Sequence, residues 1–239
     1  MSSGSPYIID PSSHANLKGK VVVVSGAANG IGAALTRALH AHGASIALGD
    51  TDSAAGTALA ASLPGTLFAA TDVTSYASVV ALFRSARAAF GRVDGAVACA
   101  GVLERGAWFT KADGTTKTAI LGLNRNLSLT LHPSTGIRTN VILPAMTETG
   151  MVGPAAAAFR AAGLAVNTAD EVAAYMVDVL ARPTRNGRPL NGLAVYVEGA
   201  RGWEIEEGLK ATMPQWLGEE PTARIEEDAR VVAAEMWAK

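Results

Sequence analysis

The chain has 239 residues, of which 49% are hydrophobic and 17% charged, a composition typical of a folded domain rather than a disordered chain. The formal net charge is −1 with no basic block, which argues against nucleic acid or an anionic membrane as a partner. The single cysteine, Cys99, excludes an internal disulfide, and the four histidines form no metal-binding motif, so no metal site is expected.

Residues 1–17 are polar and rich in serine, and they are expected to form a flexible N-terminal segment. This segment lacks the charged start and the apolar run of a secretory signal. No stretch of the chain approaches the roughly 18 apolar residues that a membrane-spanning helix needs. The sequence therefore predicts a cytoplasmic protein that does not enter a membrane.

From residue 18 onward, apolar strands and helices are expected to alternate. Val21–Val24 reads as a buried strand, and the helix over Ile31–His42 ends at Gly43. The same order then repeats, with strands over Ser45–Leu48, Thr66–Ala70 and Val93–Ala98 and helices over Ser53–Leu63 and Ser75–Phe90. This alternation predicts an α/β fold, a parallel sheet with helices on both faces.

The alternation stops after Gly101 and resumes near residue 116. A helix is expected over Thr116–Leu131 and a strand over Ile137–Leu143. Further elements follow: a helix over Thr168–Ala181, begun by a capping box of Thr168 and Glu171, and a strand over Gly192–Val197. We expect one domain over residues 18–199, with residues 200–239 as a C-terminal tail packed on it.

The segment Ser25–Gly32 has the sequence SGAANGIG and joins the first strand to the first helix. Gly26 permits a tight turn, Gly30 permits close approach of a pyrophosphate, and Gly32 permits close packing of helix on sheet. The helix N-terminus adds free amide groups and a positive dipole end. Nucleotide binding is therefore the favoured interpretation, and a purely structural turn is the alternative. The fold class is thus a doubly wound, Rossmann-type sheet.

Two acidic residues follow the next two strands. Asp50 lies near the twenty-residue offset at which an acid binds the adenosine ribose, and its charge would repel a 2′-phosphate. This favours NAD over NADP as the cofactor, with an ordinary strand-end turn as the alternative reading of Asp50. Asp72 is expected near the adenine amino group, or else as a helix cap or turn residue.

These motifs in order resemble the short-chain dehydrogenase/reductase family over Leu17–Gly199. Ser25–Gly32 resembles TGxxxGIG, Ala98–Gly101 resembles NNAG with both asparagines replaced, and Gly136–Asn140 resembles GIRVN. Pro144–Thr149 resembles PGxxxT, and the tail is similar to fungal members of secondary metabolism. The resemblance implies cofactor contacts by Gly26, Asn29, Gly30, Ile31, Gly32, Asp50, Asp72, Val73, Gly101, Lys117, Thr147 and Thr149.

The catalytic set implied by the resemblance is incomplete. Lys117 matches the lysine of the family's YxxxK motif, with a solvated helix lysine as the alternative, but Asp113 stands where the tyrosine is expected. No serine lies between Ser85 and Ser128, so the substrate-orienting serine is absent as well. An aspartate with an ordinary pKa of about 3.9 has no proton to give an alkoxide near neutral pH.

Too little chain lies between Gly101 and Lys117 for the helix and strand expected there, since a βαβ unit takes about 30 residues. One helix–strand unit is therefore interpreted as missing, through a genuine trait, a splice form or a gene model that lost coding sequence. The prediction is then a sheet of six strands, in which Ile137–Leu143 pairs directly with Val93–Ala98. Reduced helical cover predicts an exposed apolar patch, which favours homo-oligomers or aggregation.

The leading functional hypothesis is an oxidoreductase of this family. It would transfer hydride between a nicotinamide cofactor and a hydrophobic secondary alcohol or ketone, with a secondary metabolite as the substrate that the resemblance implies. The rival hypothesis is a nucleotide-binding family member without catalytic activity, favoured by the absent tyrosine and serine. A third alternative is a chain that does not fold stably.

Overall fold

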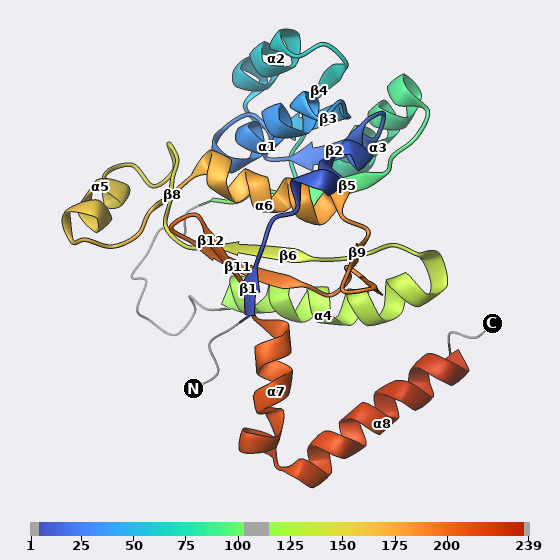
Figure 1. The fold of residues 1–239 in the computed structure, drawn as a ribbon. Helices are drawn as coiled ribbons and strands as arrows, with labels where there is room; N and C mark the ends of the chain where they lie inside the picture. The colour runs from blue at the N-terminus through green and yellow to red at the C-terminus, as the bar shows by residue number, and fades with distance from the viewer. Residues whose placement is uncertain (1–4, 103–114, 237–239) are drawn as a thin grey trace.

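The computed structural model describes residues 5–102 and 115–236, which form two four-stranded sheets with helices packed around them (Figure 1). The first sheet has the order β4-β3-β2-β5, and all of its strands are parallel. Its elements are β2 (Val21–Ser25), α1 (Gly30–Ala41), β3 (Ser45–Asp50), α2 (Ser53–Ser62), β4 (Thr66–Ala70), α3 (Tyr76–Phe90) and β5 (Gly95–Ala98).

The second sheet has the order β6-β11-β12-β1 and mixes parallel and antiparallel pairs. Strands β6 and β11 are parallel, whereas β11, β12 and β1 pair antiparallel. Its strands and the helices of this half are β1 (Ser5–Tyr7), α4 (Thr115–Thr135), β6 (Val141–Pro144), α5 (Pro154–Ala161), α6 (Ala169–Ala181), β11 (Ala194–Glu198) and β12 (Arg201–Glu204).

The remaining elements are short or lie near the C-terminus. They are a 3₁₀ helix, η1 (Pro11–Leu17), the paired strands β7 (Thr147–Glu148) and β8 (Asn167–Thr168), the hairpin β9 (Thr184–Arg185) and β10 (Arg188–Pro189), and the helices α7 (Glu206–Leu217) and α8 (Glu219–Met236). Helices α7 and α8 extend away from the sheets (Figure 1).

Helix α6 packs against both sheets and joins their cores. Its residues Ala173 and Val177 belong to a buried cluster with α1, α2 and one face of β2 and β3. Its residues Val172 and Val179 belong to a second cluster with β11. On the opposite face of the first sheet, α3 packs through Leu82 and Ala86 in a third cluster. The predicted capping box of α6 is confirmed, because Thr168 and Glu171 exchange hydrogen bonds with each other's backbone amides.

The α/β class and the alternation of strands and helices up to β5 are confirmed. The direct pairing of β5 with β6 was wrong, because in the described residues each of these strands is the edge of its own sheet. A cavity of about 370 Å³ lies beside η1 and the end of α6, with Gly95 at the start of β5 and Arg138 ahead of β6 on its walls. In the described residues, the four strands of the first sheet and the parallel pair β6 and β11 therefore lie in two separate sheets, and α6 packs against both.

Within the segment that was expected to be flexible, residues 5–17 contain β1 and η1. Strand β1 pairs with β12, and the buried Tyr7 donates a 2.6 Å hydrogen bond to Asp178 of α6. The Asp10 amide donates to the same carboxylate at 2.8 Å, and Arg182 lies 3.3 Å from it. The N-terminal segment from Ser5 is therefore anchored on α6 through one buried carboxylate.

Candidate functional site

The glycine-rich turn between β2 and α1 leaves no room for side chains at two of its glycines. A Cβ on Gly32 would lie 2.0 Å from the Gly26 carbonyl oxygen. A Cβ on Gly26, whose φ is +68°, would lie 2.5 Å from the Ala100 backbone. The turn therefore folds tightly against the start of α1 and against the chain that leaves β5, as a phosphate-binding turn requires.

Helix α1 begins at Gly30 with its first amides unoccupied by a side-chain cap. Asn29 occupies the N-cap position, but its side chain donates to Asp52 at 3.2 Å instead of capping the helix. The first four amide groups of a helix have no partner within the helix, so an uncapped first turn can bind an anion. The residues present thus fit a dinucleotide phosphate at this helix end.

Asp50 ends β3 and points its carboxylate at the same turn. One carboxylate oxygen accepts from the Ala28 amide at 2.9 Å, and the other accepts from the Asp52 amide at 3.0 Å. The side chain is half-buried, so it stays open to a ligand. This position beside the turn is the one that an acid needs to bind an adenosine ribose.

The loop after β6 reaches the glycine turn from the second sheet. A Cβ on Gly30 would lie 3.1 Å from the Cγ2 atom of Thr149, so these two residues are near neighbours. Thr147 is buried, and its hydroxyl donates to the Ala145 carbonyl at 2.9 Å. The structure therefore brings Thr149 to the glycine turn, whereas the Thr147 hydroxyl already has a structural partner.

Asp72 and Val73 follow β4 and lie exposed at the same end of the first sheet. The Asp72 carboxylate accepts from the hydroxyl and the amide of Thr74, at 2.7 and 2.9 Å. The Thr74 hydroxyl, with the amide, holds the pKa of the Asp72 carboxyl below its usual range. Asp72 is therefore a turn residue in this structure, which was the alternative reading, and a contact with adenine stays a prediction.

The remaining site residues of the sequence analysis are only partly described. Gly101 is exposed, with no atom within 4 Å of where its Cβ would lie. The backbone of Lys117 lies in the first turn of α4, and its side chain is outside the described part of the chain. Asp113 lies outside the described residues altogether. The proximity of Lys117 to a cofactor therefore stays a prediction.

All four tyrosines have other surroundings or lie exposed. Tyr7 binds Asp178, Tyr175 donates to the Ala200 carbonyl at 3.0 Å, and Tyr196 donates to Glu198 at 3.1 Å. Tyr76 is 85% exposed on α3. None of the four precedes a lysine by four residues. The four tyrosines therefore form no YxxxK motif with any lysine of the chain.

Two polar residues that the sequence analysis did not assign to the site position its second half. Asn167 is fully buried and donates to the Val197 carbonyl at 2.9 Å and to the Thr147 hydroxyl at 3.4 Å, which fixes the loop after β6. Arg138 donates to the carbonyls of Leu180, Arg182 and Leu190, which ties β6 to the end of α6. Asparagine in an otherwise apolar region was the only available signal for Asn167.

Two absences complete the description. Among residues 5–102 and 115–236, no group of three His, Cys, Asp or Glu side chains is arranged to hold a metal ion. Within the same residues, no helix is both long enough and apolar enough to cross a bilayer. The site thus offers backbone amides, one carboxylate and threonine hydroxyls, a donor set that suits a dinucleotide.

The fold is an α/β fold of the Rossmann type, and the turn between β2 and α1 is tightly packed, as in phosphate-binding turns. The sequence comparison is more specific, because residues 20–113 match the short chain dehydrogenase family model. The chain is 39% identical over 114 residues to bovine L-fucose dehydrogenase, covering 47% of this chain and 42% of that protein. It is 35% identical over 161 residues to human 3-hydroxyacyl-CoA dehydrogenase type-2, covering 67% and 59%.

Solved structures agree with this fold. A short chain dehydrogenase from Burkholderia cenocepacia in complex with NADP has a TM-score of 0.67 at 23% identity, covering 77% of this chain and 98% of that one. The 3-ketoacyl-(acyl-carrier-protein) reductase of Brucella melitensis complexed with NADH has a TM-score of 0.66 at 20% identity, covering 77% and 98%.

Residues 20–113 are therefore similar in sequence to short chain dehydrogenases, and the described structure is similar in fold to the two solved structures. The chain spans 42% of bovine L-fucose dehydrogenase and 59% of human 3-hydroxyacyl-CoA dehydrogenase type-2, about half the length of these two curated relatives.

Proposed function

We propose that the protein binds a nicotinamide dinucleotide at the Ser25–Gly32 turn, with NAD preferred over NADP. The observation that carries this proposal is the geometry of the turn, in which Gly26 and Gly32 have no space for a side chain while Asp50 accepts from Ala28. The relatives with NADP and NADH bound support a dinucleotide of either kind. A carboxylate at Asp50 would repel a 2′-phosphate, which supports NAD.

We also propose an oxidoreductase role, with a small secondary alcohol or ketone as substrate. A bound nicotinamide supplies or accepts the hydride in such a reaction. The names of the relatives support the reaction class, since they are dehydrogenases. A hydrophobic secondary metabolite as substrate and a cytoplasmic location are further proposals, drawn from the sequence resemblance alone.

The second candidate function is dinucleotide binding without efficient turnover. The specific observation in its favour is that no tyrosine precedes a lysine by four residues, so the chain lacks a phenol of tuned pKa beside Lys117. A carboxyl at Asp113 in its ordinary ionised form has no proton to donate to a nascent alkoxide. Cofactor affinity and turnover are therefore separate questions for this chain.

Titration of the purified chain with NADH, followed by nicotinamide fluorescence, tests the binding proposal. Gly32→Ala should weaken binding at least about 100-fold, because the added Cβ would lie 2.0 Å from the Gly26 carbonyl oxygen. Gly122→Ala is the matched control, since no atom lies within 4 Å of its Cβ position. The absence of affinity for NADH and NADPH at millimolar concentration in the folded protein would overturn the proposal.

A second experiment separates the two candidate functions. Wild type and Lys117→Ala are assayed with NADH and a panel of ketones, alongside the binding titration. Turnover that falls in Lys117→Ala while NADH still binds would support the oxidoreductase. Binding in wild type without turnover of any ketone would support the non-catalytic alternative.

A further inference from the structure

In the part of the chain that the structure describes, no helix covers one face of β5. Helix α3 packs against β2, β3 and β4 of the first sheet. Val23 of β2 faces α3, and its neighbour across the parallel pair is Ala96 of β5, so Ala96 points to the same face. Ala96 and Ala98 are both exposed there. Because alanine side chains are small, a helix could approach this strand closely.

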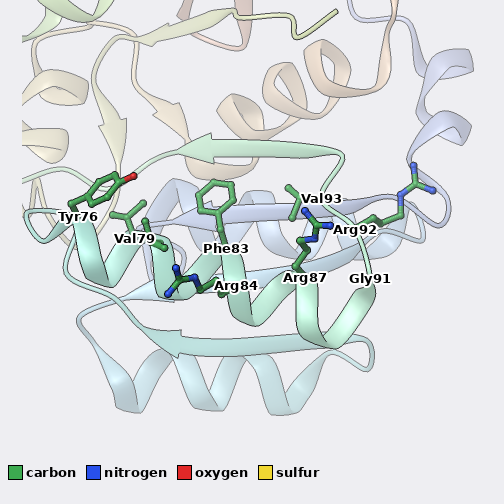
Figure 2. Close-up of a pocket in the computed structure, with 9 residues that line it drawn as sticks. Tyr76, Val79, Phe83, Arg84, Arg87, Gly91, Arg92 and Val93 are labelled. Atoms are coloured by element: carbon green, nitrogen blue, oxygen red, sulfur yellow. The ribbon is translucent and has the colours of Figure 1, made fainter. Parts of the chain in front are cut away.

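A groove of about 710 Å³ runs along α3 beside this bare strand. Its walls include Tyr76, 85% exposed, and Phe83, 38% exposed, as well as Val79 and Val80. Figure 2 shows Tyr76, Val79, Phe83 and Val93 along this stretch, with the guanidinium groups of Arg84 and Arg87 beside them. An exposed apolar groove with a charged border is typical of a protein-binding surface.

The charge of the groove restricts what can occupy it. Arg84 and Arg87 are exposed, and the hydrogen bonds and ion pairs found among the described residues give neither of them a carboxylate partner. Helix α3 itself contains no acidic residue. A matching occupant is therefore a helix with an apolar stripe and acidic flanks. At 1.5 Å per residue, the 15 residues of α3 form a binding surface about 22 Å long.

Helix α8 of this chain has that character. It has six acidic and two basic residues. In the sequence of α8, Ile225, Ala229, Val232 and Met236 follow one another at intervals of three and four, the spacing of a helix–helix seam. Ile225 is 49% exposed, and α8 lies away from both sheets, with α7 as its neighbour (Figure 1).

Hydrogen bonds hold the start of the arm formed by α7 and α8, and α8 lies away from α3 of its own chain (Figure 1). The buried Glu204 carboxylate accepts from the amides of Glu206 and Glu207 and so caps α7. Arg125 of α4 holds Glu206 at 2.9 Å. Gly218, with a φ of +100°, then separates α7 from α8.

We propose that α8 of a second copy of this chain binds in the groove along α3 and over β5, with Asp228 facing Arg84 and Arg87. A two-fold dimer makes this exchange reciprocal, so that both grooves are filled. The arrangement is independent of nucleotide binding. It completes the missing helical layer of one copy with the extended arm of the other.

Sedimentation velocity of the full chain over a range of concentrations tests the proposal. Wild type should form a dimer, and the double variant Arg84→Glu/Arg87→Glu should weaken it at least about 10-fold by placing like charges against α8. Arg37→Glu is the matched control, because Arg37 is exposed on α1 at the other face of the sheet. Circular dichroism melts verify that each variant folds.

A cross-linking experiment separates exchange between copies from folding back within one chain. Val80→Cys and Ile225→Cys are made in separate chains, each with Cys99→Ser, then mixed and treated with a short bis-maleimide. Covalent heterodimers are expected. A monomeric wild type, a dimer that the charge reversal does not weaken, or cross-links found only when both cysteines are on one chain would each overturn the proposal.

Discussion

The centre of the first sheet and the facing edges of the two sheets differ sharply in burial, although all are parallel strands. Val21–Val24 of β2 are buried on both faces, each at most 3% exposed. In β5 exposed and half-buried residues alternate, and in β6 every residue is half-buried. The difference follows from position, because β2 lies between β3 and β5 in the first sheet whereas β5 and β6 are each the edge strand of their own sheet in the described residues. The site lies across this boundary, with the glycine turn and Asp50 on one side and Thr149 on the other.

The largest expected effect on stability comes from truncating a buried leucine of β3, and the same truncation in β6 tests the difference in burial. Leu48→Ala in β3 should lower the free energy of unfolding by about 2–5 kcal/mol, because Leu48 is fully buried and the truncation leaves a cavity. Leu143→Ala in β6 should cost less than about 2 kcal/mol, since Leu143 is only half-buried. Urea unfolding measures both, and equal losses would contradict the comparison.

The next effect concerns the helix that joins the two sheets. Asp178→Ala should lower the free energy of unfolding by about 3 kcal/mol, because the Tyr7 hydroxyl and Arg182 would lose their buried partner. Tyr7→Phe removes one hydrogen bond to the same carboxylate and should cost about 1 kcal/mol. Thermal melts rank the two variants. A larger loss in Tyr7→Phe than in Asp178→Ala would show that the carboxylate is not the anchor.

A smaller effect is expected at the end of β5, from the chemistry of Cys99. Burial raises the pKa of the Cys99 thiol from an ordinary 9.0 to about 11. The folded thiol therefore holds its proton more tightly than the unfolded one, so folding stability should be unaffected below pH 9 and should fall as the pH rises towards 11. At pH 8 the folded protein has about 100-fold less thiolate than the unfolded chain, and iodoacetamide should label it correspondingly slowly.

The stability of Cys99→Ser supplies the control for that measurement. Its unfolding free energy should lack the decline between pH 9 and 11 that wild type shows. Rapid labelling of folded wild type at pH 8 would indicate that the strand end opens more freely than the structure describes.

The smallest effect is expected at the base of the C-terminal arm. Arg125→Ala should cost about 1 kcal/mol or less, because the Arg125 side chain is 45% exposed and solvent screens its ion pair with Glu206. Arg160→Ala is the matched control on an exposed pair with Glu148. Chemical denaturation of both measures the difference, and a loss of several kcal/mol in Arg125→Ala would indicate that the arm contributes to the core.

The sequence predicted the elements whose signals are local. Residue periodicity, glycine stops and the Thr168 capping box placed α1, α2, α3 and α6 within a few residues of their observed bounds. Strand β1 was missed because its partner is β12, almost 200 residues later in the chain, and a three-residue strand has no periodicity of its own. Helices α7 and α8 were missed because their residues were interpreted as a tail packed on the domain.

The candidate site shows the same division. The glycine turn and Asp50 were predictable because both belong to one contiguous β-α-β stretch. The approach of Thr149 to Gly30 depends on how the second sheet is placed, and only the structure shows it. The pairing of β5 with β6 was wrong because chain order says nothing of how the strands divide between two sheets, with α6 packed against both.

The position of α6 between the two cores determines how the protein unfolds. Its side chains belong to the cores of both sheets, which share no backbone hydrogen bond between β5 and β6 in the described chain. Unfolding of α6 would expose apolar surface in the cores of both sheets at once. Unfolding of one sheet is therefore coupled to unfolding of the other by the side chains of α6, not by backbone hydrogen bonds between β5 and β6. The two halves should unfold in a single thermal transition.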